Sequence, residues 1–418
     1  MNARLFLLPV FFLSIACNDA DKSQTTSSES DSSESKLTKG SYAYDADFLK
    51  KNTAKTLELK DAGGNARVLL SADYQGRVMT STAKGNTGTS YGWLNYTLIA
   101  SSEKKKQFNP VGGEERFWLG PEGGQYSIYF KGKDSFAFGN WQVPAIIDTV
   151  TYDVVNADAQ SATFRKTASV TNYSGTVFNI EISRIINLLS PEAIAGELNT
   201  NIDPSLATVA YTTENSIKNT GSAAWKKESG LLSIWLLAML TPSDQTKVII
   251  PFEPGKNAAK LITRDYFGAI PPERLIITDS FLVLNCDGKF RSKVGISPVI
   301  ARPIAGSYDF EKNILTITKF TVDKNGSYVN SKWELQQNPY KGDAVNAYND
   351  GPLADGTQMG PFYEIESSSP AKELNPGETQ VYKQSTFHFE GDFAKLETLA
   401  QQILGVKLSE IKSGIKTK

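Results

Sequence analysis

The sequence has few metal-binding side chains, no excess of charge and no long hydrophobic run. It contains one His and two Cys in 418 residues, which excludes a zinc or iron–sulfur site built from those side chains. The 44 basic and 45 acidic residues nearly cancel, and without a Lys/Arg-rich segment no nucleic acid is expected as a partner. The run LLSIWLLAML is too short to cross a bilayer and is predicted to be a strand buried on both faces.

The first residues have the pattern of an export signal. Arg4 precedes the apolar run Leu5–Ile15, and small residues lie next to Cys17. This segment looks like a bacterial lipobox, so residues 1–16 are predicted to be a lipoprotein signal peptide and Cys17 the acylated residue. The alternative is an ordinary secretory signal that happens to contain a Cys. The prediction places the protein in the cell envelope of a bacterium as a lipid-anchored protein, with the outer membrane favoured and the globular part outside the cytoplasm.

The chain divides by composition after the signal. Residues 17–39 are predicted to be a flexible tether, because they are almost wholly Ser, Thr, Asp, Glu, Lys and Gln and cannot bury enough apolar surface to fold. Residues 40–418 are predicted to form a single domain. Cys286 then has no disulfide partner, and it is expected to be a small buried apolar side chain.

Short runs of alternating or continuous apolar residues recur from residue 40 onward, separated by Gly, Asn, Asp and Pro turns. So many strands, with few helix-sized windows, indicate an all-β antiparallel sandwich rather than alternating β–α–β units. Helices are predicted at Asp45–Lys55 and Asp392–Ile411, the second from the helical spacing of its apolar residues.

Three segments carry a resemblance to a known group of proteins. They are VGGEERFWLGPEGG (Val111–Gly124), GDAVNAYNDGP (Gly342–Pro352) and FYEIESSSPAKELNPGETQVYKQSTFHF (Phe362–Phe389). With them the chain resembles the galactose mutarotase-like superfamily, which is related to the aldose 1-epimerases, and within it a branch of exported bacterial lipoproteins. The resemblance covers residues 60–390 and implies a large antiparallel β-supersandwich.

The resemblance also implies roles in catalysis. In the mutarotases a Glu on the C-terminal strand takes the proton of the anomeric hydroxyl, and this role falls on Glu364. The His that should protonate the ring oxygen is expected near Asn219–Gly230, where the sequence has none. The only His, His388, lies on the final strand and is expected to be a surface or edge residue. His388 and Tyr363 are the remaining candidates for the acid.

A cluster of charged and aromatic residues suggests a sugar site on chemical grounds alone. Glu114, Arg116, Trp118 and Glu122 lie close together in sequence, and alternation in a strand would put the first three on one face. Carboxylates and guanidinium groups bind hydroxyls, and aromatic rings cover the C–H side of a sugar. Trp141 is predicted to form a second aromatic wall. The alternative is that the aromatic residues are core and that Arg116 pairs with a neighbouring Glu.

Glu364 and Glu366 share one face of a predicted strand and are both candidates for ligand binding. Two carboxylates side by side are poorly placed to flank a glycosidic bond. A glycosidase or lyase would therefore need its second carboxylate from Glu122 or Asp350.

The loop GDAVNAYNDGPLADG is rich in oxygen donors, of which Asn349 and Asp350 are predicted to reach the ligand. Calcium binds such side chains, but the spacing is not that of an EF-hand. A turn-rich loop capped by Asn and Asp is the preferred interpretation, so no cofactor is predicted and calcium is the alternative.

These observations predict an exported lipoprotein that binds carbohydrate in a mutarotase-like cleft, with or without weak epimerase activity. The alternatives are an enzyme acting at a sugar anomeric centre, with Glu364 as base, and a carboxylate-dependent glycosidase or lyase. Carbohydrate is the expected partner, and the N-terminal lipid is the expected contact with a membrane.

Overall fold

The structure is a computed structural model that describes residues 37–414. The predicted signal peptide, Cys17 and the tether as far as residue 36 lie outside the described residues. The model has 36% strand and 15% helix, so the predicted all-β class is confirmed. None of the helices within residues 37–414 is long and apolar enough to span a membrane.

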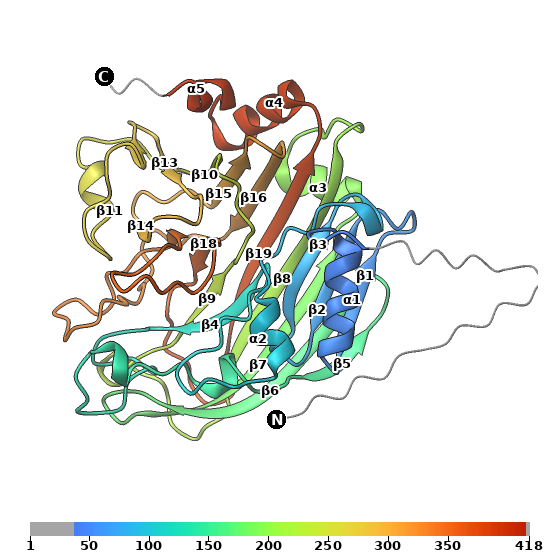
Figure 1. Ribbon diagram of the computed structural model, residues 1–418. Coiled ribbons are helices and arrows are strands. Elements are labelled where there is room, and N and C mark those ends of the chain that lie inside the picture. The colour runs from blue at the N-terminus through green and yellow to red at the C-terminus, as the bar shows by residue number, and fades with distance from the viewer. Residues whose placement is uncertain (1–36, 415–418) are drawn as a thin grey trace, which may run out of the picture. The chain divides into compact units, whose positions relative to one another are not determined.

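A ten-stranded antiparallel sheet is the largest layer of the fold (Figure 1). Its order is β12-β13-β10-β15-β16-β19-β8-β7-β6-β5. The strands are β5 (Asp153–Ala157), β6 (Ser161–Thr171), β7 (Val177–Leu188), β8 (Ala207–Asn219), β10 (Thr246–Pro251), β12 (Leu275–Ile277), β13 (Phe281–Asn285), β15 (Ile304–Asp309), β16 (Ile314–Phe320) and β19 (Thr379–Glu390).

Two smaller antiparallel sheets complete the β structure. The six-stranded sheet has the order β11-β14-β17-β18-β9-β4, and the three-stranded sheet the order β1-β2-β3. Their strands are β1 (Thr56–Lys60), β2 (Arg67–Ser71), β3 (Arg77–Thr82), β4 (Arg116–Gly120), β9 (Ser233–Leu237), β11 (Ile262–Thr263), β14 (Ser292–Ile296), β17 (Val345–Asn349) and β18 (Tyr363–Ser368). The predicted buried strand in LLSIWLLAML is confirmed as β9, whose five residues are all buried.

The main core lies between the six-stranded sheet and the ten-stranded sheet. The Ser367 hydroxyl of β18 donates to Gln384 on β19, and the Arg184 guanidinium of β7 lies 5.7 Å from the Phe117 ring centroid of β4. Because side chains alternate along a strand, Trp118 and Glu366 must therefore point to the other face of the six-stranded sheet, away from the large one.

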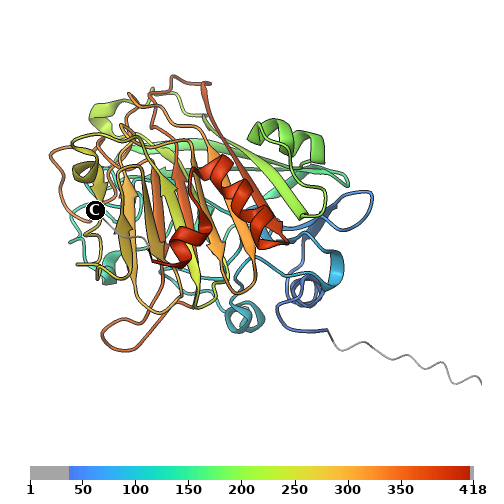
Figure 2. The same ribbon diagram turned by 90° about the horizontal axis from the view of Figure 1, so that it is seen from above.

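Helices cover the remaining apolar surfaces. They are α1 (Tyr42–Asn52), α2 (Tyr96–Ser101), α3 (Pro191–Leu198), α4 (Phe393–Leu404) and α5 (Leu408–Lys412). The two C-terminal helices lie across the outside of the ten-stranded sheet (Figure 2, red), where Leu396 and Leu399 pack with Phe387 and Phe389 in a second core. A third core joins α1 and α2 to the three-stranded sheet.

Both predicted helices exist, but their limits were wrong. α1 begins one turn before the predicted start, because the Ser41 side chain accepts a hydrogen bond from the Tyr44 amide and so caps the helix. The predicted C-terminal helix is two helices. Gly405 takes a left-handed conformation (φ 74°) that ends α4 before α5 begins.

Candidate functional site

One face of the six-stranded sheet carries charged and aromatic side chains in place of the apolar ones that usually cover a sheet. Residues paired across antiparallel strands share a face, and the register therefore brings together side chains from five strands. We call this the charged face. It consists of Arg116 and Trp118 on β4, Trp235 on β9, Glu364 and Glu366 on β18, Tyr348 on β17 and Lys293 on β14.

Arg116 and Glu364 form a buried hydrogen-bonded pair that reaches across β9. The Nη2 atom of Arg116 donates to Oε1 of Glu364, and the two residues are only 2% and 5% exposed. The guanidinium also lies 4.7 Å from the Trp118 ring centroid. Its Nε and Nη1 atoms have no hydrogen-bond partner among residues 37–414. Buried N–H groups are normally satisfied, so these donors are available to a ligand or to water.

Glu366 forms a buried ion pair with Lys293 on the charged face. Its Oε2 atom accepts from Nζ of Lys293 at 2.8 Å and from Nε1 of Trp235 at 3.0 Å. Its Oε1 atom has no partner within the described part of the chain. The charged face therefore offers a free acceptor as well as free donors.

Two buried carboxyls of this region, Glu364 and Glu122, have raised pKa values. Burial, opposed by Arg116 and reinforced by Glu366, raises the pKa of Glu364 to about 8. Burial, opposed by Lys293 and reinforced by Glu366, raises the pKa of Glu122 to about 7. Burial alone would lower the pKa of Lys293, but the Glu366 and Glu122 carboxylates outweigh it and raise that pKa. Protons can therefore exchange here near neutral pH.

Aromatic rings enclose one side of the charged face. Trp118 contacts Trp235 edge-on at 5.6 Å and Phe108 edge-on at 5.4 Å between ring centroids. Trp141 stacks on Trp333 at 5.9 Å and contacts Phe108 at 5.8 Å. The structure thus brings the predicted Trp118 and Trp141 into one aromatic assembly beside Arg116.

Glu114 and His388 lie elsewhere, between the sheets. Nε2 of His388 is 2.8 Å from Oε1 of Glu114, Nδ1 is 2.9 Å from the Thr316 hydroxyl, and the ring stacks on Tyr91 at 4.1 Å. His388 is fully buried on a central strand, so the expectation of a surface or edge residue was wrong. Its partner lies 274 positions away in the chain.

The expectation that Glu114 shares a face with Arg116 was also wrong. Gly112 and Gly113 have φ values of 95° and 112°, and β4 begins only at Arg116, so strand alternation does not extend back to Glu114. Tyr363, the other candidate acid, points away from the charged face, with its hydroxyl 2.8 Å from that of Ser307 on β15.

The predicted loop residues have separate partners. The Asn349 amide donates to the Phe290 carbonyl at 2.9 Å, and its oxygen accepts from the Gly288 amide at 2.8 Å. Asp350 accepts from the Tyr348 hydroxyl at 2.5 Å, which ties it to the edge of the charged face, while burial raises its pKa. Within residues 37–414 no three His, Cys, Asp or Glu side chains form a group that could hold a metal ion.

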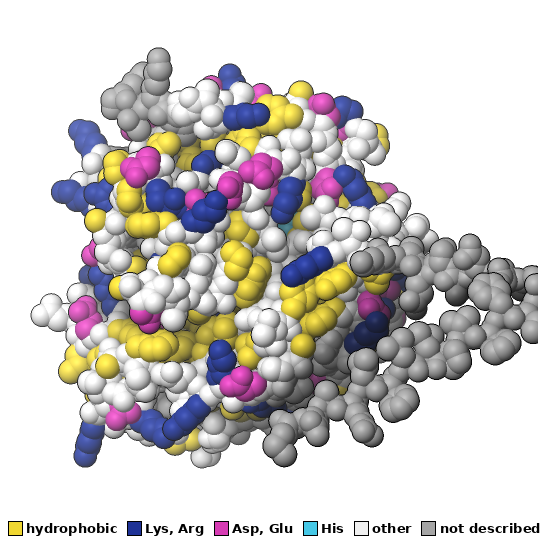
Figure 3. Space-filling view, in the orientation of Figure 1, with side chains coloured by type: hydrophobic (Ala, Val, Ile, Leu, Met, Phe, Trp, Pro, Cys, Tyr) yellow, Lys and Arg dark blue, Asp and Glu magenta, His cyan; other side chains and the backbone are white. Residues whose placement is uncertain are grey.

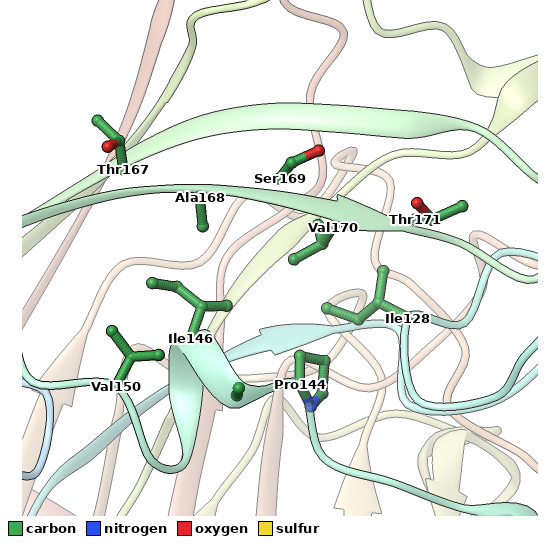
Figure 4. A pocket seen from close by; sticks show the side chains of 10 residues that line it. Ile128, Pro144, Ile146, Val150, Thr167, Ala168, Ser169, Val170 and Thr171 are labelled. Carbon is green, nitrogen blue, oxygen red and sulfur yellow. The ribbon is translucent and has the colours of Figure 1, made fainter.

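A cavity of about 380 Å³ lies elsewhere, between β6 and the segment 128–150 (Figure 4). Ala168 and Val170 point into it toward Ile146, whereas Thr167 and Ser169 point away. None of the predicted site residues lines this cavity.

Sequence reasoning did not predict Trp235, Lys293 and Trp333, which lie on the charged face or beside it. Trp235 lies within an apolar run that predicts burial alone, and only alternation within β9 turns its indole toward Glu366. Nothing in the sequence surroundings of Lys293 distinguishes it as a site residue. Trp333 lies in a polar loop and joins the site through its stacking on Trp141.

One family model and several solved structures match this chain. The model of a family of unknown function, DUF6786, matches residues 40–415. Solved structures similar to this chain are aldose 1-epimerase and galactose mutarotase-like proteins. A search of curated proteins found no significant match.

Three of these solved structures have low sequence identity to this chain. A putative aldose 1-epimerase from Escherichia coli K12 is 11% identical, with a TM-score of 0.48, over 80% of this chain and 99% of its own. The Slr1438 protein from Synechocystis sp. PCC 6803 is 12% identical, with a TM-score of 0.48, over 82% and 98%. A galactose mutarotase-like protein from Lactobacillus casei ATCC 334 is 10% identical, with a TM-score of 0.46, over 80% and 99%.

Proposed function

This chain belongs to DUF6786, a family of unknown function, and we propose that its charged face is a carbohydrate-binding site. The observation that carries the proposal is the set of unpaired polar atoms gathered there. Nε and Nη1 of Arg116 and Nε1 of Trp118 are free donors, and Oε1 of Glu366 is a free acceptor, among residues 37–414. Each would cost about 1–3 kcal/mol if left unpaired in the protein interior.

A sugar supplies what these atoms lack. Its hydroxyls donate and accept at once, so one ligand can satisfy Arg116, Trp118 and Glu366 together. Its C–H face can lie against the indole rings that border the same atoms. Specific polar groups within a largely aromatic enclosure are typical of small-molecule sites.

The proposal is tested by a glycan and monosaccharide binding screen on the purified protein and on Arg116→Lys. Lysine keeps the positive charge but removes the planar set of donors, so we expect affinity to fall at least tenfold, about 1.4 kcal/mol. Arg165→Lys, the same change at an exposed position of β6, should bind as the wild type does. Loss of binding in both variants, or no binding by the wild type, contradicts the proposal.

We propose also that the protein is exported and anchored in the bacterial envelope through a lipid on Cys17, as its first residues suggest. Cys17→Ser should then move the protein from the membrane fraction to the soluble fraction. Mass spectrometry of the N-terminal peptide should show an acylated Cys17 in the wild type. An unmodified Cys17 in a secreted protein would instead support an ordinary signal peptide.

A second candidate function is epimerisation at a sugar anomeric centre, which the raised pKa values of Glu364 and Glu122 favour. Glu364, once ionised, would take the proton of the anomeric hydroxyl, while protonated Glu122 would give a proton to the ring oxygen as the ring opens. The ring then closes on the other face with both proton transfers reversed. Because the step needs ionised Glu364 and protonated Glu122 together, polarimetry should show anomerisation with a bell-shaped pH profile that peaks between pH 7 and pH 8 and is abolished in Glu364→Gln. Binding without such a rate leaves only the first function.

A further inference from the structure

The two most exposed large hydrophobic side chains of residues 37–414 are Phe138, which stacks on Trp141, and Leu335, which is close in sequence to Trp333. Phe138 is 65% exposed and stacks on Trp141 at 6.0 Å with an interplanar angle of 20°. Leu335 is 70% exposed and lies two residues from Trp333, which stacks on Trp141 at 5.9 Å. Hydrophobic side chains also reach the surface over β4 and the loops beside it (Figure 3). Exposed apolar groups that gather in this way mark a binding surface.

Hydrogen bonds to the backbone order the turn that carries Phe138. Nε2 of Gln107 donates to the Phe138 carbonyl at 2.7 Å and to the Trp141 carbonyl at 3.2 Å. The Asn140 amide donates to the Ser135 carbonyl at 3.0 Å, which closes the same turn. Phe138 therefore presents an exposed, flat apolar ring on an ordered turn. A ligand that binds there does not have to order this turn, which reduces the entropy lost on binding.

Ring contacts connect this surface to the charged face. Phe138 contacts Trp141, Trp141 contacts Phe108 at 5.8 Å, and Phe108 contacts Trp118 at 5.4 Å. The Arg116 guanidinium lies 5.8 Å from the Phe108 ring centroid. Three ring contacts thus connect the exposed Phe138 ring to Trp118, beside the Arg116–Glu364 pair, and this distance is more than a single sugar ring can cover.

We propose that the exposed Phe138 ring, backed by Trp141 and Trp333, forms an outer subsite that stacks a further sugar unit, so that the ligand is an oligosaccharide whose terminal unit occupies the charged face. The inference rests on the proposed carbohydrate function. A flat stack of rings fits the C–H face of a pyranose, and its continuity with the unpaired donors of Arg116 and Trp118 favours a single chain of linked sugars as the occupant.

Calorimetric titration of the full-length protein tests the subsite. The probes are glucose, galactose, mannose and xylose and the linear di-, tri- and tetrasaccharides of each. In the wild type, at least one oligosaccharide should bind about tenfold more tightly than its monosaccharide, the gain expected from one well-packed aromatic contact. Phe138→Ala should remove this gain and leave the affinity for the monosaccharide unchanged.

Two further variants separate the outcomes. Val177→Ala, at a 54% exposed position of β7, should keep the gain, because it removes a similar exposed apolar group outside the path. Phe267→Ala tests a competing position for the subsite, because Phe267 is 46% exposed and its ring contacts Tyr348 of the charged face at 5.9 Å. This variant should also keep the gain. Equal affinity for monosaccharide and oligosaccharides in the wild type, or an undiminished gain in Phe138→Ala, overturns the outer subsite alone. The outer subsite is also overturned if Phe267→Ala, and not Phe138→Ala, removes the gain. Absence of binding to every sugar overturns the proposed function as well.

Discussion

Two buried arginine–glutamate pairs begin at neighbouring residues of the chain, Glu115 and Arg116, and differ in how fully they are satisfied. Nη2 of Arg184 donates to Oε1 of Glu115 at 2.9 Å, Nε donates to Asn215 at 2.8 Å and Nη1 to the Gln75 carbonyl at 3.4 Å. Oε2 of Glu115 accepts from Gln384 at 2.9 Å. Every polar atom of this inner pair has a partner.

The outer pair, Arg116 and Glu364, is buried to nearly the same degree but leaves two guanidinium atoms unpaired within the described residues. Burial raises the pKa of the glutamate in both pairs, so neither burial nor the direction of the pKa shift separates them. The difference is in the free hydrogen-bonding capacity. We infer that the inner pair joins the sheets and that the outer pair is arranged for a ligand.

Breaking the inner pair should have the largest effect on stability. Arg184→Met leaves the Glu115 carboxylate buried without its counter-charge, and we expect a loss of about 3 to 5 kcal/mol in the free energy of unfolding. Urea denaturation measures the loss. The double variant Arg184→Met/Glu115→Met removes both charges and should recover part of it. A loss below that of Arg116→Met would contradict the assignment of the inner pair as structural.

Breaking the outer pair should cost less. In Arg116→Met the remaining carboxyl, Glu364, already has a pKa of about 8 and can stay protonated at neutral pH, which avoids a buried charge. We expect a loss of about 1 to 2 kcal/mol, measured by the same urea titration at pH 7. The loss should grow above pH 8, where Glu364 would have to ionise without its partner. A pH-independent loss would show that Glu364 is ionised at neutral pH.

The same carboxyl should make stability depend on pH. Between about pH 4.5 and pH 8 an unfolded glutamate is ionised while Glu364 in the folded protein keeps its proton, so the unfolded state binds fewer protons and stability falls as pH rises. The slope is at most about 1.4 kcal/mol per pH unit for one group. Glu364→Gln should flatten it. Glu122, with a pKa of about 7, acts over much of this window, so thermal melts are best compared in a Glu122→Gln background.

Sequence reasoning reached the parts of the site that follow from local geometry. Strand alternation correctly placed Glu364 with Glu366, and Arg116 with Trp118, because it depends only on spacing along β18 and β4. It failed for Glu114, because Gly112 and Gly113 adopt positive φ values and the strand begins later than the pattern indicates.

What the sequence could not show were the partners. Arg116 meets Glu364 from 248 positions away, and His388 meets Glu114 from 274. Such pairings depend on the order of strands in the sheets, which the apolar pattern of any one strand does not contain. The same limit explains why Trp235 was assigned to the core. Its run of neighbours predicts a buried strand, and only the pairing of β9 with β18 brings the indole to Glu366.

Two matched Trp→Phe changes sharpen the comparison at the level of single hydrogen bonds. Nε1 of Trp235 donates to Glu366, whereas Nε1 of Trp118 has no partner within residues 37–414. Both changes remove the same atoms from a buried ring, so the difference between them reports the hydrogen bond. Trp235→Phe should be less stable than Trp118→Phe by about 1 kcal/mol in urea denaturation. Sugar affinity should fall more in Trp118→Phe than in Trp235→Phe, because the unused Trp118 donor is available to the ligand. Equal effects of the two changes on both measurements would remove the distinction between satisfied and available groups.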